Sequence, residues 1–255
     1  MGNKILYKYL NFEGGIKSLT NLTLKYSSPK SVNDPTEFFV SDFYDISELE
    51  KPKIIQYFRK KYGYQYTGFT FSEDINSKEN IQEELSSFHK ILAKNFYFLS
   101  LTHLNNSLSM WYHYADKFKG IIIGYDAEAF PHLYDVKYVK EPPKIRHNCV
   151  LDDNARTKQL IDILTTKSEA WSYEQEARDL LYMNKEDPRY EYFENGIVPV
   201  ESKFIKEICL GTNCSRKDRK RICNICKNKQ IECSFSELVL DYSRYVSIKT
   251  IETNN

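Results

Sequence analysis

Two glutamates separated by one residue, Glu174 and Glu176, are the side chains of this sequence best suited to catalysis. Arg178 follows them, and residues 176–183 read as a strand. If both glutamates lie on the strand, its period of two points them to the same side, where mutual repulsion raises the proton affinity of one. Such a pair suits the stabilisation of a cation and the orientation of a nucleophile. The alternative is a solvated ladder of charges at a sheet edge, formed by the two glutamates and the arginine.

A second candidate group combines small hydroxyl side chains with aromatic rings. Ser100 and Thr102 lie in a segment, residues 96–102, that reads as a strand, and Trp111 and Tyr114 follow closely. Small hydroxyl residues on a strand let a flat ligand approach the backbone, and nearby Trp and Tyr rings can stack on it. The pattern therefore predicts a ligand pocket. The alternative is that the two rings, three residues apart on a helical turn, plug the core.

A third candidate group is a cysteine-rich basic segment near the C-terminus. Residues 201–230 hold nine Lys or Arg and three acidic residues, a local net charge of +6. Four thiolates can hold a tetrahedral zinc ion, and the positive charge suits a phosphate backbone. The alternative is free thiols on a polar loop or a solvated helix over residues 215–229, and a redox role is disfavoured because no strand–helix–strand context is expected there. The candidate zinc ligands are Cys214, Cys223, Cys226 and Cys233.

The elements that must position these residues are short strands mixed with a few helices. The Gly14-Gly15 pair is expected to break the chain before a short helix. An ordered turn is expected over residues 31–35, and two further helices are expected to end near Gly63 and Lys94. This order of elements, without regular alternation of strand and helix, favours the α+β class over a doubly wound parallel sheet. A helix is also expected over residues 154–168, and strands over residues 4–10, 22–26, 96–102, 120–126, 134–139, 176–183, 203–210 and 238–248.

Composition bounds the class of protein. The chain has 255 residues, of which 41% are hydrophobic and 28% charged, so it can bury a full core and is neither disordered nor of low complexity. We expect a single domain over residues 1–255, with residues 211–234 as a cysteine-rich basic insertion within it. The formal charge of +1 restricts any nucleic-acid contact to a local patch. No membrane span or export signal is visible, which predicts a cytoplasmic protein.

Several common catalytic motifs are absent from the sequence. It contains no G-x-G-x-x-G, no G-x-x-x-x-G-K-[ST], no H-E-x-x-H and no G-x-S-x-G. A Rossmann cofactor site, a P-loop, a zincin site and an α/β-hydrolase nucleophile therefore lack their usual support.

Four ordered blocks carry a resemblance to a known family. Residues 6–9, 27–37, 109–120 and 169–178 contain Leu-Tyr-Lys-Tyr, Asn-Asp-Pro-Thr-Glu, Ser-Met-Trp-Tyr-His-Tyr-Ala-Asp and Trp-Ser-Tyr-Glu-Gln-Glu-Ala-Arg respectively. In this order they resemble the bacterial DUF2971 family over about residues 4 to 210. The family name itself implies no activity.

A looser similarity suggests an activity. Leu-Tyr-Lys at residues 6–8, Ser-Leu-Thr at 100–102 and Glu-Gln-Glu at 174–176 are similar to the Arg/His, Ser-Thr-Ser and Glu-x-Glu signature of ADP-ribosyltransferases. Lys8 stands where that family usually has Arg or His, and a lysine meets a phosphate as a point charge without a planar fork. The resemblance implies split β-sheets with flanking helices, and NAD as the ligand.

The same resemblance implies roles for individual residues. Glu176 would hold the nicotinamide-ribose hydroxyl and stabilise the oxocarbenium ion as nicotinamide leaves, and Glu174 would position the acceptor. The residues it implies for binding NAD are Tyr7, Lys8, Tyr9, Ser100, Thr102, Trp111, Tyr114 and Arg178.

The function implied is an NAD-dependent ADP-ribosyltransferase that modifies a macromolecule, as a toxin of a toxin–antitoxin module or as an anti-phage effector. The basic segment favours RNA over protein or DNA as the acceptor, and an antitoxin or chaperone would be a further partner. One alternative is a non-catalytic nucleic-acid-binding or protein-binding module that uses the basic cysteine-rich segment. Another is hydrolysis of NAD without an acceptor.

Overall fold

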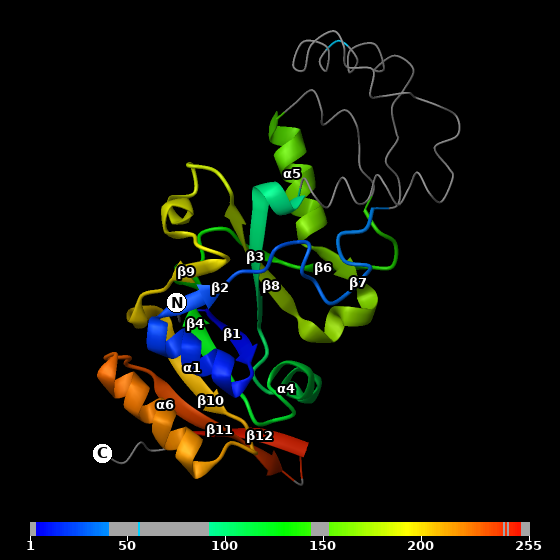
Figure 1. Cartoon of the computed structure of the whole chain (residues 1–255). Coiled ribbons are helices and arrows are strands. Elements are labelled where there is room, and N and C mark those ends of the chain that lie inside the picture. The colour runs from blue at the N-terminus through cyan, green and yellow to red at the C-terminus, as the bar shows by residue number, and fades with distance from the viewer. Residues whose placement is uncertain are drawn as a thin grey trace. The chain divides into compact units, whose positions relative to one another are not determined.

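The computed structural model describes residues 4–40, 56, 92–143, 153–241, 243 and 245–250, and groups the chain into two compact units (Figure 1). Unit 1 comprises Met1–Ser28, Phe96–Val136 and Ser172–Asn255, and unit 2 comprises Pro29–Asn95 and Lys137–Trp171. The helix expected to end near Gly63, and most of the one expected to end near Lys94, lie outside the described residues. The expectation of a single domain stays a prediction.

Unit 1 is built on an eight-stranded mixed sheet with the order β12-β11-β10-β4-β1-β3-β8-β5 (Figure 1). Neighbouring strands are antiparallel except β10 and β11, which are parallel. A large mixed sheet with several helices confirms the α+β class. The strands are β1 (Ile5–Leu10), β3 (Phe96–Thr102), β4 (Ile121–Asp126), β5 (Leu133–Asp135), β8 (Glu176–Tyr182), β10 (Ile205–Leu210), β11 (Ser234–Asp241) and β12 (Tyr245–Thr250).

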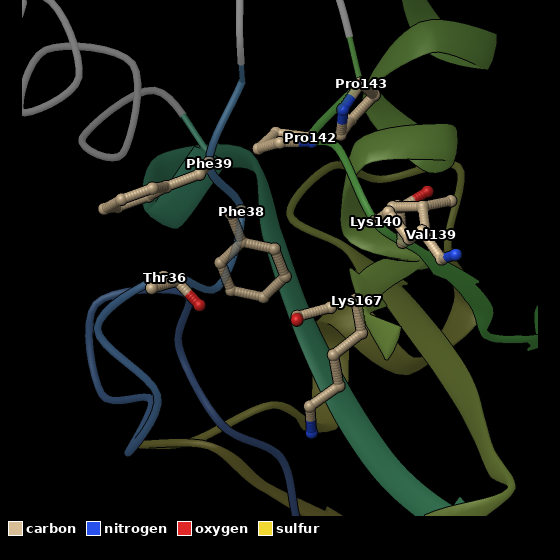
Figure 2. Close-up of a pocket in the computed structure, with 10 residues that line it drawn as sticks. Thr36, Phe38, Phe39, Val139, Lys140, Pro142, Pro143 and Lys167 are labelled. Carbon is tan, nitrogen blue, oxygen red and sulfur yellow. The ribbon is translucent and has the colours of Figure 1, made fainter. Parts of the chain in front are cut away.

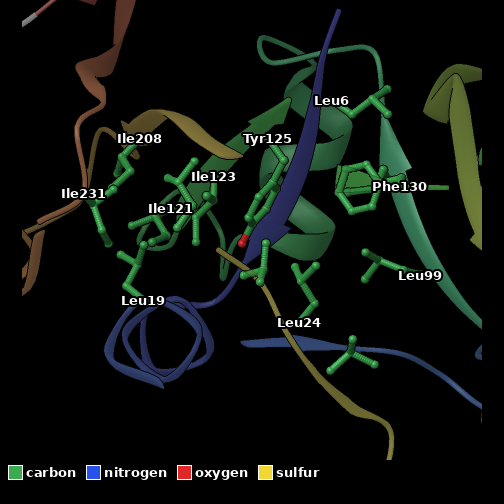
Figure 3. Packing of buried hydrophobic residues seen from close by; sticks show 14 of the residues in the cluster. Leu6, Leu19, Leu24, Leu99, Ile121, Ile123, Tyr125, Phe130, Ile208 and Ile231 are labelled. Atoms are coloured by element: carbon green, nitrogen blue, oxygen red, sulfur yellow. The ribbon is translucent and has the colours of Figure 1, made fainter. Parts of the chain in front are cut away.

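The core of unit 1 lies on both faces of this sheet. Every residue of β4 is buried, as expected for a central strand whose run of Ile side chains is covered on either side. On one face, Leu6, Leu99, Ile121 and Ile123 pack with residues of α1 (Phe12–Asn21) (Figure 3). On the other face a smaller hydrophobic cluster packs under α4 (Leu108–Tyr114). Outside the large sheet, β2 (Thr23–Lys25) pairs with β9 (Ile197–Pro199) as a separate two-stranded sheet.

The first helix begins earlier than the glycines suggested. Asn11 caps α1, since its side chain accepts a hydrogen bond from Gly14 N at 2.7 Å, so Gly14 and Gly15 lie inside the helix and the predicted break is wrong. A Cβ at Gly15 would approach Ile121 Cδ1 to 2.3 Å. The glycine therefore serves the close approach of helix and sheet, which outweighs its weak helix propensity.

The cysteine-rich basic segment forms a crossover. α6 (Arg216–Asn228) connects β10 to β11, which pair in parallel, and this is a strand–helix–strand unit. The sequence-based premise that no such context surrounds the cysteines is therefore wrong. The helix expected over residues 215–229 is confirmed, with Ser215 as its cap.

Two expected strands are divided in the structure. The strand expected over residues 238–248 is the end of β11 and most of β12, paired antiparallel. The strand expected over residues 134–139 is β5 in unit 1 and β6 (Lys137–Val139) in unit 2.

The helix expected over residues 154–168 ends early. It is α5 (Asp153–Leu164), followed by β7 (Thr166–Ser168). The Thr165 and Thr166 hydroxyls bond to the carbonyls four residues earlier, at 2.8 and 2.6 Å, a local pattern that weakens a helix interior and here accompanies its end. In unit 2, β6 and β7 pair in parallel.

Four short 3₁₀ helices complete the described elements: η2 (Ala127–Ala129), η4 (Glu169–Glu174), η5 (Pro188–Tyr192) and η6 (Ser202–Phe204). Among the described helices, none combines the length and apolar character that crossing a bilayer requires.

Candidate functional site

Strand pairing in unit 1 brings three predicted site residues into one row. Thr102 on β3 is paired with Tyr7 on β1 and with Glu176 on β8. Residues that face each other across antiparallel strands share a face of the sheet. Ser100, two residues before Thr102, is paired with Arg178 and lies on the same face. The sheet therefore assembles the predicted cluster from strands far apart in sequence.

The second glutamate of the pair is buried and bound to its neighbour on the strand. Arg178 donates from Nε to Glu176 Oε1 at 2.8 Å and from Nη2 to Oε2 at 3.0 Å, and the two residues are 1% and 5% exposed. The guanidinium carbon lies 5.0 Å from the centre of the Phe98 ring. Because β8 lies between β3 and β5 and these charges are buried, the alternative of a solvated ladder at a sheet edge is wrong.

The first glutamate reaches the same cluster by a different route. Glu174 is the last residue of η4, so it is not on the strand as the two-residue period assumed. Gln175 between the two acids has a left-handed backbone with φ of 43°, which costs energy for a residue with a side chain. The Thr102 hydroxyl donates to the Glu174 carbonyl at 2.5 Å and holds this turn against β3.

An aromatic hydroxyl orients the Glu174 carboxylate. Tyr114, at the end of α4, donates from its hydroxyl to Glu174 Oε1 at 2.6 Å. Burial, together with this hydrogen bond to a carboxylate, raises the pKa of Tyr114 well above its ordinary value. The phenol therefore stays protonated at neutral pH and remains a hydrogen-bond donor.

Lys8 adds a second cation to the cluster, besides Arg178. Its Nζ donates to the Ser100 carbonyl at 2.7 Å, between β1 and β3. Burial lowers the pKa of Lys8 to about 8, and the negative charges of Glu176 and Glu174 oppose part of this lowering. The amine therefore titrates close to neutral pH, which is unusual for a lysine.

Tyr7 is positioned by a glycine on the neighbouring strand. Gly124 is paired with Tyr7 on one side and Glu207 on the other, and a Cβ there would lie 3.1 Å from both Tyr7 Cε1 and Glu207 Cβ. The ring can thus cross over β4, and its hydroxyl donates to Glu207 Oε2 at 3.0 Å. Burial is the main cause that raises the pKa of Tyr7 to about 12, and Glu207 adds to it. The Asn105 side chain donates to the same hydroxyl at 3.4 Å.

Two predicted ligand-binding rings lie in the core. Trp111 is fully buried and packs edge-on against Tyr9, with ring centres 5.5 Å apart, and its Nε1 donates to the Asn105 carbonyl at 3.0 Å. Trp111 is therefore a core residue, as in the alternative drawn from the helical spacing, and does not wall a ligand pocket. Of the two rings proposed to wall a pocket, Tyr114 is the one that reaches the acidic pair.

Sequence reasoning did not identify Phe98, Asn105, Gly124 and Glu207. Phe98, Gly124 and Glu207 enter the cluster through strand pairing and Asn105 through hydrogen bonds, and no motif marks Asn105, Gly124 or Glu207 in the sequence. The alternation of Phe98 with Ser100 and Thr102 along β3 was a usable signal, because alternate residues of a strand share a face.

The four cysteines predicted as zinc ligands lie around α6. Cys226, buried near the end of the helix, interacts with the Cys233 thiol. This interaction and burial both raise the pKa of Cys226, while the same interaction lowers the pKa of Cys233 against the opposing effect of burial. Within the described residues, no three or more His, Cys, Asp or Glu side chains are placed to hold a metal ion. A zinc ion on Cys214, Cys223, Cys226 and Cys233 stays a prediction that metal analysis of the purified protein would test.

The cluster has the elements of a site that stabilises positive charge. Two buried carboxylates converge at the start of β8, one fixed by Arg178 and the other by Tyr114, with Lys8 beside them. Carboxylates held in place in a water-poor setting stabilise a developing cation without reorganisation. The fold and the site together define an α+β protein with an acidic cluster on one face of a mixed sheet.

Comparison with known protein families gives a match over part of the chain. A family model described as "Protein of unknown function (DUF2971)" matches residues 110–178, from α4 to the middle of β8. This supports the DUF2971 resemblance, and the matched segment contains Tyr114, Glu174 and Glu176. Neither a curated protein nor a solved structure matches the chain.

Proposed function

We propose that this protein is an NAD-dependent ADP-ribosyltransferase that modifies a macromolecule in the cytoplasm, as a toxin or an anti-phage effector. The observation that carries the proposal is the convergence of buried Glu174 and Glu176 around Thr102, with the Lys8 amine close enough that both carboxylates influence its pKa. The left-handed Gln175 between the acids supports it, because backbone strain concentrates at functional sites.

The site residues fit the charges of NAD. Lys8 supplies a positive charge for the diphosphate. It donates to the backbone of β3, which carries the small hydroxyl side chains of Ser100 and Thr102. Both oxygens of the Glu176 carboxylate accept hydrogen bonds from Arg178, and this bidentate contact offsets part of the cost of burying a negative charge. A fixed carboxylate of this kind stabilises positive charge on the nicotinamide ribose.

The proposed reaction is a substitution at the ribose carbon. The bond between that carbon and the nicotinamide nitrogen breaks, and nicotinamide leaves as a neutral molecule with the bonding electron pair. A bond then forms from the carbon to an acceptor oxygen or nitrogen, whose proton passes to Glu174 or to water. Tyr114 fixes the Glu174 carboxylate for this role.

Release of nicotinamide from NAD tests the assignment of Glu176. Glu176→Gln keeps the shape of the side chain and removes its charge, so we expect the rate to fall by about two to four orders of magnitude. Glu186→Gln, at an exposed glutamate of unit 1, is the matched control and should leave the rate unchanged. A wild-type rate in Glu176→Gln would reject the assignment.

A second variant separates catalysis from folding, because Glu176→Gln leaves the buried Arg178 with a weaker partner. The double variant Glu176→Gln/Arg178→Gln removes both charges and should recover part of the lost thermal stability. If Glu176 is catalytic, the double variant still fails to release nicotinamide. Recovery of turnover together with stability would assign the pair a structural role.

RNA is the acceptor that we favour, because α6 presents a basic surface. Five of its cationic residues are exposed, namely Arg216, Lys217, Lys220, Arg221 and Lys227. Incubating the protein with labelled NAD and cell extract, then separating RNA, DNA and protein, identifies the acceptor by the fraction that carries the label. Label only in free ADP-ribose would indicate hydrolysis of NAD.

The same surface favours a second candidate function, a non-catalytic nucleic-acid-binding module. In that case RNA binding is sensitive to salt, while NAD neither binds saturably nor turns over.

A further inference from the structure

Unit 2 contains a cavity of about 240 Å³ that the proposed function does not use. Its wall is formed by the turn before residue 40, by the segment from Val139 to Pro143 and by β7, and Figure 2 shows the Phe38 ring beside Lys167. The volume is below the roughly 300 to 1,000 Å³ of clefts for drug-sized ligands. It suits one ring system and is too small for a whole dinucleotide such as NAD.

The turn that supplies the aromatic wall is held in place. Asp34 Oδ1 accepts hydrogen bonds from Thr36 N at 2.8 Å and from Thr36 Oγ1 at 2.7 Å. Phe38 is buried with a left-handed φ of 63°, a conformation that is a marked outlier for a bulky residue. Phe39 also lines the cavity. The fold thus accepts backbone strain to place an aromatic ring at this position, as functional sites often do.

The remaining wall carries positive charge and hydroxyl groups. Lys140 is exposed, and Lys167 is buried with its Nζ 5.0 Å from the centre of the Trp171 ring. Thr166 and Ser168 on β7 add hydroxyls, and none of the ten described residues that line the cavity is acidic. An anionic ligand is therefore favoured over a cationic one.

We propose that this cavity binds one nucleotide unit, with its base against Phe38 and the prolines and its phosphate at Lys140. Aromatic rings beside cations are the combination that single-stranded nucleic acids and nucleotides require, because every base has a flat face and every phosphate a negative charge. Hydroxyls of β7 supply donors and acceptors for the edge of the base. The nucleotide is either free or part of an RNA strand, since both present the same chemistry.

Binding is measured by calorimetry with AMP and adenosine, and by anisotropy with labelled single-stranded oligoadenylate. Lys140→Glu reverses the charge at the rim and should weaken binding about tenfold or more. Ser168→Phe, at an exposed position of the wall, fills the cavity and should abolish binding. Lys158→Glu and Lys158→Phe, at an exposed residue of α5 outside the wall, are the matched controls and should bind as wild type.

The ligands distinguish the two sources. Binding of AMP as tight as that of the oligomer assigns the site to a free nucleotide, and binding of the oligomer alone assigns it to RNA. The wall variants separate this site from the proposed NAD site, because Lys140 and Ser168 belong to unit 2 and the residues proposed to bind NAD belong to unit 1. Absence of binding by every ligand, or equal losses in the wall variants and their Lys158 controls, would overturn the proposal.

Discussion

The pKa of Lys8 predicts a measurable pH dependence of the KM for NAD. Its amine is charged below its pKa of about 8 and loses that charge above it. A contact with the NAD diphosphate would therefore be present at pH 7 and lost as the pH rises through 8 to 9. We expect the KM for NAD to increase over this window, while kcat changes less.

Lys8→Arg is the matched variant, because a guanidinium keeps its charge across the whole range. The increase in KM should move to higher pH or disappear. A KM that rises equally in wild type and Lys8→Arg would show that another group titrates. The free energy of unfolding supplies an independent check. Between pH 8 and 10.5 Lys8 is protonated more in the unfolded chain than in the folded one, so its contribution makes the free energy of unfolding rise with pH.

Arg189 completes a buried network behind the acidic cluster. It donates to both oxygens of Asp187 at 2.9 and 2.8 Å, to the Tyr26 hydroxyl at 3.1 Å, and to Asp179, which is fully buried on β8. The network ties η5 to the sheet. Without Arg189 the buried Asp179 and Asp187 carboxylates would lose the guanidinium that pairs with both of them.

We expect Arg189→Ala to lower the free energy of unfolding by about 3 to 5 kcal/mol, the usual cost of removing one partner of a buried ion pair. Denaturant unfolding followed by circular dichroism measures this loss. Arg216→Ala, at an exposed arginine of α6, should change stability by less than about 0.5 kcal/mol. Similar small losses in both variants would show that the buried network is energetically neutral.

At the scale of elements, the loop after α4 stores strain. Asp116, Lys117 and Phe118 have consecutive left-handed backbones, with φ of 46°, 51° and 69°. For residues with a side chain this conformation costs roughly 1 to 2 kcal/mol each. Hydrogen bonds hold the loop, among them Gly120 N to the Ala115 carbonyl at 2.8 Å and Asn213 N to the Phe118 carbonyl at 3.0 Å.

Lys117→Gly should relieve part of this strain and raise the free energy of unfolding by up to about 1 kcal/mol. The side chain that is lost makes one distant contact, with Nζ 5.9 Å from the centre of the Tyr112 ring. Lys119→Gly, two residues on and outside the left-handed run, is the control and should be neutral or destabilising. Equal destabilisation by both glycines would indicate that the loop is unstrained.

At the scale of the whole molecule, the net charge is near zero although one local surface is strongly basic. The formal charge of the chain is +1, yet residues 201–230 carry a net charge of +6 and place most of it on α6. Arg219 and Arg221 are paired with Glu237 and Glu13, at 2.7 and 3.3 Å. Lys217 and Lys220 are exposed on the same helix and are suitable positions to test contacts with phosphate.

RNA affinity should fall steeply with salt, and Lys217→Glu/Lys220→Glu should reduce the slope of log K against log salt by about 1 to 2. Lys25→Glu/Lys249→Glu makes the same change of net charge at exposed lysines outside α6 and should keep most of the slope. Titrations of labelled RNA at several salt concentrations give these slopes. Equal reductions in the two variants would mean that only total charge matters.

The sequence by itself determined most of the local structure. The periods of β1, β3 and β8 and the cap at Ser215 depend on neighbouring residues, and the observed bounds lie within a few residues of those expected. Grouping the two glutamates with the hydroxyls of the middle strand also followed from the resemblance of short motifs. These features are readable because a few adjacent residues fix them.

Only the tertiary structure decided which charges are buried and which glycines lie in helices. Whether β8 is an edge or an interior strand depends on β3 and β5, and Gly15 is helical because α1 approaches Ile121 closely. The parallel pairing of β10 and β11 likewise turned the cysteine-rich segment into a crossover. Each outcome depends on partners tens of residues or more away in the chain, and local propensity carries no information about which distant strand supplies the neighbour.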